Sequence, residues 1–191
     1  GKPVNRLIGI NGEDNVCSVI NIKEFSPDRY VMLFSRQGYV KKTSLAAFSN
    51  PRTNGIIAAD VPEGDTLFEA QISNGDNHVI VGTHLGKALR FHENDVREMG
   101  RTARGVRCIK LGTGDFVVGA AVIGEEDQTI LTVTENGIGK KSHLELYRIQ
   151  TRGGKGLINI RFTEKVGRVI GLVTLGSCDD LILSSRNGIV N

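Results

Sequence analysis

Basic side chains recur at fixed distances from glycine residues along this sequence, and binding of phosphate is the chemistry that they could do. Lys42, Arg90 and Lys141 each stand four residues after a glycine. A cation that pairs with a phosphate releases condensed counterions, which gives affinity for a nucleic acid of any sequence. A nearby glycine lets the backbone approach the phosphate and donate its amide. The candidate set for DNA contact is Lys41, Lys42, Arg52, Arg90, Arg101, Arg104, Arg107, Lys140, Lys141, Arg152 and Lys155.

The positive charge is concentrated in three windows. The chain has a net charge of only +3 and a pI of about 8.8. Residues 36–52, 97–110 and 140–161 nevertheless carry +4, +4 and +5, which leaves −10 for the remainder. Such segregation is typical of a surface that meets a polyanion. For a single pair such as Lys41 and Lys42 a solvated strand surface is the simpler explanation, and only the recurrence favours a binding surface.

Residues that could catalyse a reaction or hold a metal ion are few. The four histidines show no metal-ligand spacing, and residues 137–142 lack the spacing of a phosphate-binding loop. The cysteines form no paired motif, which favours a reducing cytoplasm, and we interpret them as small buried apolar residues. No apolar run approaches the roughly 20 residues of a membrane span. We therefore expect no catalytic, cofactor-binding or metal-binding residue. The side chains considered are His78, His84, His92, His143, Cys17, Cys108 and Cys178.

The segments that must position the cations form a sequence repeat. An alternating apolar stretch ending in a glycine turn occurs at 30–38, 78–86, 129–137 and 180–188, with the glycines 48, 51 and 51 residues apart. A second glycine follows each complete copy, and then another apolar run. Short apolar runs separated by glycine turns predict an all-β protein. The dipeptides Asn136-Gly137 and Asn187-Gly188 predict type I′ hairpin turns, in which both turn positions have positive φ.

The period predicts the domain organisation. About 50 residues with about four strands are typical of one β-propeller blade. We expect one repeat domain over 1–191, with the ends forming either a closed four-bladed ring or, as we favour, an open arc. A β-sandwich with accidental similarity is the alternative. The predicted units are the second half of a blade at 1–29, whole blades at 30–77, 78–128 and 129–179, and the first half of a blade at 180–191.

One motif resembles a known family. The segment Gln150, Thr151, Arg152, Gly153, Gly154, Lys155, Gly156 resembles the Q-R-R-G-G-K-G box in the C-terminal domain of DNA gyrase A. Thr151 stands where the family has its second basic residue, so the segment is similar to the degenerate boxes of later blades. Further segments that look like this family lie at 1–5, 38–43, 48–57, 90–97 and 99–107.

The resemblance implies a fold and a set of partners. It implies a β-pinwheel of six blades, of which this chain is a fragment, that wraps double-stranded DNA around its basic perimeter. It also implies a holoenzyme of two gyrase A and two gyrase B proteins that uses ATP and Mg²⁺, with this domain attached to the N-terminal part of gyrase A. The family's catalytic tyrosine belongs to another domain, so Tyr30, Tyr39 and Tyr147 receive no catalytic role.

The leading hypothesis is a non-catalytic domain that binds and bends duplex DNA without sequence preference and supports negative supercoiling. The corresponding domain of topoisomerase IV, which supports relaxation or decatenation, is the sister hypothesis. A propeller that binds an acidic protein partner is the second class. An enzyme is third, because no acid, base and nucleophile can be nominated.

Overall fold

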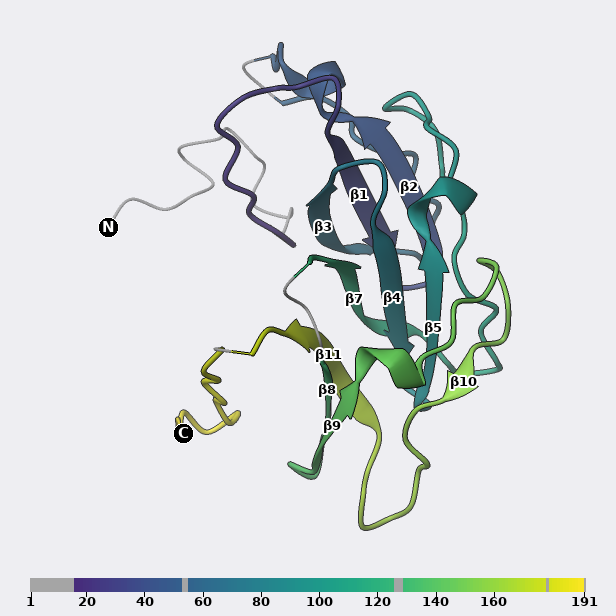
Figure 1. Ribbon diagram of the computed structural model, residues 1–191, viewed down its shortest axis with the longest axis vertical. Coiled ribbons are helices and arrows are strands. Elements are labelled where there is room, and N and C mark those ends of the chain that lie inside the picture. Colours follow the sequence, from purple (N-terminus) through teal and green to yellow (C-terminus); the bar gives the residue numbers. More distant parts are fainter. Residues whose placement is uncertain (1–15, 53–54, 126–128, 178, 191) are drawn as a thin grey trace.

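The part of the chain that the structure describes folds into three antiparallel sheets, as the all-β prediction required (Figure 1). The computed structural model describes residues 16–52, 55–125, 129–177 and 179–190. Its strands are β1 Tyr30–Ser35, β2 Tyr39–Ser44, β3 Leu67–Ser73, β4 His78–Thr83, β5 Lys87–His92, β6 Val106–Arg107, β7 Val117–Ile123, β8 Thr129–Thr134, β9 Gly139–His143, β10 Leu157–Ile158 and β11 Val169–Leu175. Its short 3-10 helices are η1 Leu45–Phe48, η2 Glu93–Asp95 and η3 Leu144–Leu146.

Each repeat begins with a hairpin whose turn ends on a left-handed glycine. Gly38, Gly86, Gly137 and Gly188 have φ between 76° and 84°, and each amide donates to the carbonyl three residues earlier. No described residue other than glycine has positive φ. The predicted type I′ turns are therefore wrong. The loops have only the glycine in the left-handed region, which matches the three-residue hairpin loop that closes on such a glycine.

Strands are shared between successive repeats. The first sheet has the order β3-β1-β2-β6 and the second has β10-β5-β4-β7. Strands β6 and β10 belong to the repeat that follows the rest of their sheet in the sequence. Each predicted whole blade from residue 78 onward therefore supplies one short strand to the sheet before it. The third sheet, β11-β8-β9, contains no such fourth strand among the described residues.

The sheets stack face to face because the central strands are apolar on both sides. In β4, Val79 and Val81 pack toward the first sheet, whereas Ile80 packs toward the third. Successive residues of a strand point to opposite faces, so one strand joins two cores. Figure 1 shows β3, β7 and β11 gathered at one side of the stack, while β2, β5 and β10 lie at the other. We call the edge formed by β2, β6, β5 and β10 the outer rim.

The cysteines do not all fit the buried interpretation. Cys108 is 1% exposed and packs in the core between the first two sheets. Cys17 is exposed, which corrects the prediction, because it lies before β1 and outside the sheets, in a segment whose Ser18 hydroxyl donates to the Ala70 carbonyl at 3.2 Å. Cys178 lies outside the described residues.

Candidate nucleic-acid interface

The outer rim is built twice by the same backbone contacts. Where the first and second repeats meet, the Cys108 amide donates to the Gly38 carbonyl at 2.8 Å. Where the second and third meet, the Asn159 amide donates to the Gly86 carbonyl at 2.9 Å. The loops before these residues, 99–105 and 150–156, cross the edges of β2 and β5 in the same way. Residues at matched offsets therefore lie at matched places on the rim.

Two arginines at the first junction surround one aromatic ring. The guanidinium carbons of Arg104 and Arg107 lie 5.0 and 5.7 Å from the ring centroid of Tyr39. Tyr39 and Arg107 are directly paired across β2 and β6. Both arginines are exposed, and neither has a carboxylate within ion-pair distance among the described residues. Two cations near one ring, without a carboxylate beside them, favour binding of an anion from solution.

Sequence reasoning missed Tyr39 as part of this site. The available signal was an aromatic residue directly after the turn glycine, but its pairing with Arg107 depends on a strand contributed by the next repeat. A residue 68 positions away in the chain could not be placed opposite Tyr39 from spacing alone.

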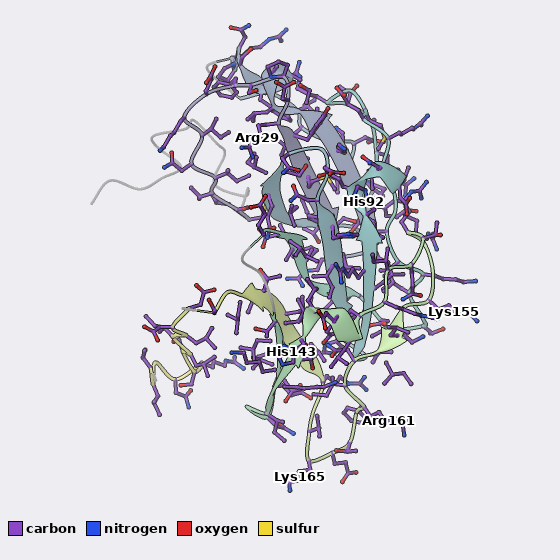
Figure 2. The ribbon with its side chains drawn as sticks, in the orientation of Figure 1. Arg29, His92, His143, Lys155, Arg161 and Lys165 are labelled. Carbon is purple, nitrogen blue, oxygen red and sulfur yellow. The ribbon has the colours of Figure 1, made fainter. Side chains whose placement is uncertain are left out.

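The box motif lies on the rim, and its two cations, Arg152 and Lys155, have different surroundings. Lys155 is exposed and projects from the outer edge in Figure 2. Arg152 instead donates through Nε to the Asp95 carbonyl at 2.6 Å and through Nη1 to the Arg107 carbonyl at 3.2 Å. Arg152 therefore joins the third repeat to the second, and Lys155 is the box cation that is left exposed.

The remaining box residues shape the loop. Gly153 and Gly156 have φ of +78° and +70°, and Gly156 faces the Ala88 carbonyl so closely that a Cβ would lie 2.7 Å from it. The Gln150 amide donates to the Arg90 carbonyl at 2.8 Å. Thr151 is exposed. The two left-handed glycines fold the loop flat against β5, which leaves Lys155 at its outer side.

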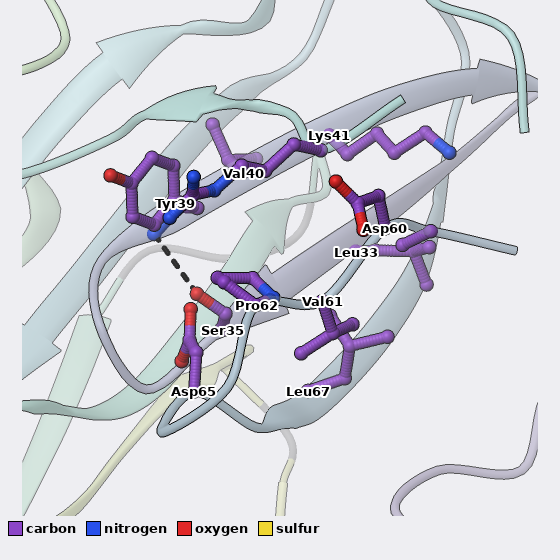
Figure 3. A pocket seen from close by; sticks show the side chains of 12 residues that line it. Leu33, Ser35, Tyr39, Val40, Lys41, Asp60, Val61, Pro62, Asp65 and Leu67 are labelled. Atoms are coloured by element: carbon purple, nitrogen blue, oxygen red, sulfur yellow. Dashed lines mark hydrogen bonds between the residues drawn. The ribbon is translucent and has the colours of Figure 1, made fainter. Parts of the chain in front are cut away.

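Lys41 lies inside the protein and is removed from the candidate interface. Its side chain is 2% exposed and lines a small pocket beside Tyr39 and Asp60 (Figure 3). Its Nζ donates to the carbonyls of Ala58 and Arg101. Burial and the nearby Arg101 charge lower the pKa of Lys41 to about 8. An amine that is already satisfied by two carbonyls does not reach a DNA phosphate.

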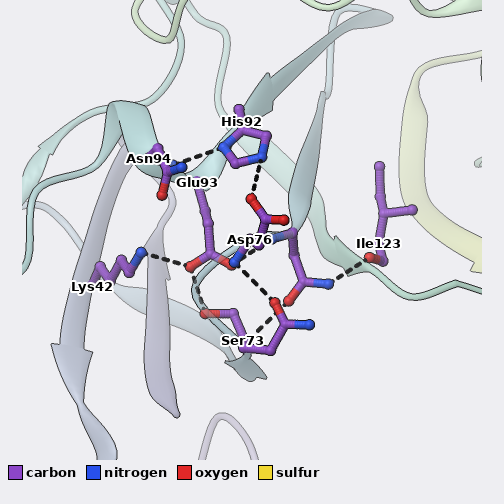
Figure 4. Close-up of polar contacts among 9 residues, drawn as sticks. Lys42, Ser73, Asp76, His92, Glu93, Asn94 and Ile123 are labelled. Carbon is purple, nitrogen blue, oxygen red and sulfur yellow. Dashed lines mark hydrogen bonds and ion pairs between the residues drawn. The ribbon is translucent and has the colours of Figure 1, made fainter. Parts of the chain in front are cut away.

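Lys42 is likewise removed, because it forms an ion pair within the core. Its Nζ lies 2.9 Å from Oε2 of Glu93, and both side chains are buried (Figure 4). Glu93 also accepts from the Ser73 hydroxyl at 2.8 Å and from the Asn77 amide at 2.7 Å. Sequence reasoning did not identify Glu93, which follows β5 and connects the second repeat to the first.

Arg90 occupies the place of Lys42 at the second junction. It is half-buried, burial lowers its pKa, and its Nη1 donates to the Leu144 carbonyl at 3.3 Å. Lys140 and Lys141, at the matching offsets of the third repeat, are exposed on β9, to which the described residues add no fourth strand. The Lys140 Nζ donates to the Asn159 carbonyl at 2.6 Å. The residues four positions after the turn glycine therefore form inter-repeat contacts where a following repeat is packed against them.

The remaining basic residues near the glycines are exposed or half-buried. Arg52 is exposed and Arg101 is half-buried beside Lys41. Lys110 and Arg161, five residues after the second glycine, are both exposed. Arg104 and Arg107 thus lie exposed at the first junction and Lys155 lies exposed at the second, whereas Lys41, Lys42 and Arg90 are turned inward.

Two observations concern other kinds of site. Within the described ranges, no group of three or more His, Cys, Asp or Glu side chains could hold a metal ion. No helix in the same ranges is long and apolar enough to cross a membrane.

Comparison with known proteins points to one family. Residues 29–74, 77–123 and 128–175 match the model of the DNA gyrase C-terminal domain, a β-propeller. The DNA gyrase A protein of Haloquadratum walsbyi is 40% identical over 193 residues, which cover 98% of this chain and 22% of that protein. The gyrase A protein of Chlamydia trachomatis is 41% identical over 191 residues, covering 98% and 23%. This chain thus spans about a fifth of the length of these curated relatives.

Solved structures agree on the fold. The C-terminal domain of DNA topoisomerase IV superposes with a TM-score of 0.92 at 26% identity, covering 100% of this chain and 60% of that one. The DNA gyrase A C-terminal domain superposes with a TM-score of 0.87 at 25% identity, covering 99% and 63%. The predicted propeller class is confirmed.

Proposed function

Since the chain belongs to the DNA gyrase C-terminal domain family, we propose that its outer rim binds duplex DNA through the phosphate backbone and bends it. The observation that carries this proposal is the repeated placement of unpaired cations on one edge. Arg104, Arg107 and Lys155 are exposed there without a carboxylate partner among the described residues. Aromatic side chains that could stack single-stranded bases are few, at 5% of the sequence, which favours a duplex.

Bending is proposed because the cations lie on successive repeats. Smooth bending of 20 to 30 base pairs costs about 1–6 kcal/mol. Contacts from one repeat alone would leave the duplex straight, whereas contacts from two neighbouring repeats offset that cost and follow the curve of the rim. No base-specific contact is required, so the binding is independent of sequence.

The test measures affinity for a fluorescein-labelled duplex of about 40 base pairs as a function of salt. We expect the triple variant Arg104→Gln, Arg107→Gln, Lys155→Gln to lower the slope of log affinity against log salt by about 2.7, since each lost phosphate contact removes about 0.9. A matched control neutralises Lys23, Arg29 and Arg186, exposed cations that belong to the terminal segments or precede β1. The control has the same net charge and should keep the wild-type slope.

Three results would count against the proposal. An equal decrease of the salt slope in both triple variants would mean that the net charge, not the position of the cations on the rim, governs binding. An unchanged slope in the rim variant would remove these residues from the interface. No retention of duplex DNA at low salt would favour the alternative of a scaffold that binds an acidic protein.

At the level of the whole protein we propose a role in negative supercoiling. The domain would present a wrapped DNA segment to a holoenzyme of gyrase A and gyrase B in the bacterial cytoplasm, where the other domains use ATP and Mg²⁺. In this proposal the chain contributes binding and geometry, and the cleavage of DNA belongs to other domains of the holoenzyme.

The topoisomerase IV domain is the second candidate, because that structure superposes with the higher TM-score of the two. A plasmid assay on the holoenzyme that carries this domain separates them. Introduction of negative supercoils supports the gyrase role, and relaxation or decatenation alone supports the topoisomerase IV role.

A further inference from the structure

The two rim junctions have the same backbone geometry. At the first, Gly105 faces the Val40 carbonyl so closely that a Cβ would lie 2.7 Å from it. At the second, Gly156 faces the Ala88 carbonyl at the same distance. Because Val40 and Ala88 each stand two residues after a turn glycine, side chains around the two contacts can be compared position by position.

A cross-strand pair next to each glycine contains one cation and one uncharged side chain. At the first junction the pair is Tyr39 on β2 and Arg107 on β6. At the second it is Lys87 on β5 and Ile158 on β10. Side chains directly opposite one another in a sheet project from the same face. The cation therefore lies on the edge strand at the first junction and on the neighbouring strand at the second.

The second cation of each junction stands at the same position relative to the junction glycine. Arg104 stands directly before Gly105, and Lys155 directly before Gly156. Each junction thus combines two cations with one large uncharged side chain. At the first, both arginines lie over the Tyr39 ring at 5.0 and 5.7 Å. At the second, the uncharged side chain is Ile158, which is 64% exposed although it is apolar.

The surroundings of Lys87 suit a phosphate contact. The residue is half-buried, and no carboxylate lies within ion-pair distance of it among the described residues. A lysine stem packs along an apolar neighbour while its ammonium stays in water. Beside Ile158, the stem of Lys87 has such a neighbour, and its ammonium can extend past the edge strand.

We propose that Lys87 makes the DNA-backbone contact at the second junction that Arg107 makes at the first. This inference rests on the proposed DNA binding and adds a residue to it. Ile158 serves as the apolar support for the lysine stem, as Tyr39 supports the arginines. DNA that passes along the rim then meets two cations at each junction.

The experiment compares single variants of the whole chain in the same salt titration. We expect Lys87→Gln to lower the salt slope by about 0.9 and the affinity by about eightfold at 0.1 M salt. Lys23→Gln removes an identical charge from an exposed site in the N-terminal segment and should leave both unchanged. Lys87→Arg should retain the wild-type slope. The melting temperature of each variant is measured, and it should stay at the wild-type value.

An exchange of the pair tests the geometry itself. The double variant Lys87→Tyr, Ile158→Arg copies the first junction onto the second and should restore the slope that Lys87→Gln loses. An unchanged slope in Lys87→Gln, while Arg107→Gln lowers it, overturns this inference and leaves the proposed function standing. Absence of DNA binding by the wild-type chain overturns both. Failure of the double variant, if it folds as the wild type does, overturns the equivalence of the two junctions.

Discussion

Replacement of the turn glycines by alanine tests the packing of one repeat against the next. Gly86 and Gly137 end equivalent hairpin turns and have φ of +84° and +76°. A methyl group at Gly86 would overlap the backbone carbonyl of Ile160, whereas nothing lies within 4 Å of the matching point at Gly137. The two substitutions therefore share the cost of a left-handed alanine and differ in whether a following repeat is in the way.

The magnitudes follow from these contacts. A left-handed alanine costs about 1–2 kcal/mol, which is all that Gly137→Ala should lose. Gly86→Ala must also displace the segment after β10, in which the amides of Asn159 and Ile160 donate to the Gly86 carbonyl at 2.9 and 3.1 Å. Weakening each of these two hydrogen bonds costs up to about 0.5–1.5 kcal/mol, and overpacking costs about 1–3 kcal/mol. Gly86→Ala should therefore lose roughly 3 kcal/mol more stability than Gly137→Ala. Gly38→Ala is intermediate, because its Cβ would lie 3.0 Å from the Ile109 carbonyl.

Urea unfolding followed by far-ultraviolet circular dichroism measures the difference in stability between the two variants. In thermal unfolding, the melting temperature of Gly86→Ala should lie roughly 6–12 °C below that of Gly137→Ala. The expected order of stability loss is Gly86, then Gly38, then Gly137. Equal losses at Gly86 and Gly137 would refute the reasoning, because they would show that the following repeat does not press on the turn.

Three further predictions concern buried groups. Glu93→Ala should lower the free energy of unfolding by about 3–5 kcal/mol, since it leaves the Lys42 ammonium buried without a carboxylate. In urea unfolding, the double variant Lys42→Met, Glu93→Leu should recover most of that loss. No recovery in the double variant would contradict the role of the ion pair. Burial holds the pKa of Lys41 at about 8, below its ordinary 10.5, so the unfolded chain binds more protons between these values and stability should rise as the pH goes from 8 to 10.5. Lys41→Met should abolish this part of the rise, and an identical pH dependence in the variant would contradict it. Burial raises the pKa of the Cys108 thiol to about 12. Ellman's reagent at pH 8 should therefore label Cys17 in the native protein and Cys108 only after unfolding. Peptide mapping that finds both cysteines labelled at one rate would contradict the buried position of Cys108.

Local features of the fold could be predicted from the sequence because they are properties of short segments. Alternating apolar residues and a following glycine define each hairpin, and the turn glycines all have positive φ as expected. The turn type was predicted wrongly, because Asn136 keeps a negative φ and the loop closes with a left-handed glycine alone. The difference is one residue of backbone conformation, which the hairpin tolerates without any change in its apolar pattern.

The direction of the basic side chains was decided by tertiary packing. Lys41 and Lys140 stand at the same offset from their glycines, yet Lys41 is 2% exposed and Lys140 is exposed, because a following loop covers β2 and none of the described residues covers β9 in the same way. Offsets from glycine also could not single out Lys87 as the proposed DNA contact, because its cross-strand partner Ile158 comes from the next repeat.

The sequence by itself determined the repeat, the hairpins and the family, because these depend on residue types within a few positions of each other. Only the tertiary structure decided which cations are exposed and which are buried. Groups from other segments hold Lys41 and Lys42 inside the protein: the Ala58 and Arg101 carbonyls accept from Lys41, and Glu93 pairs with Lys42. The physical reason is that a charge is free for a phosphate only where no carbonyl or carboxylate of a neighbouring repeat already satisfies it.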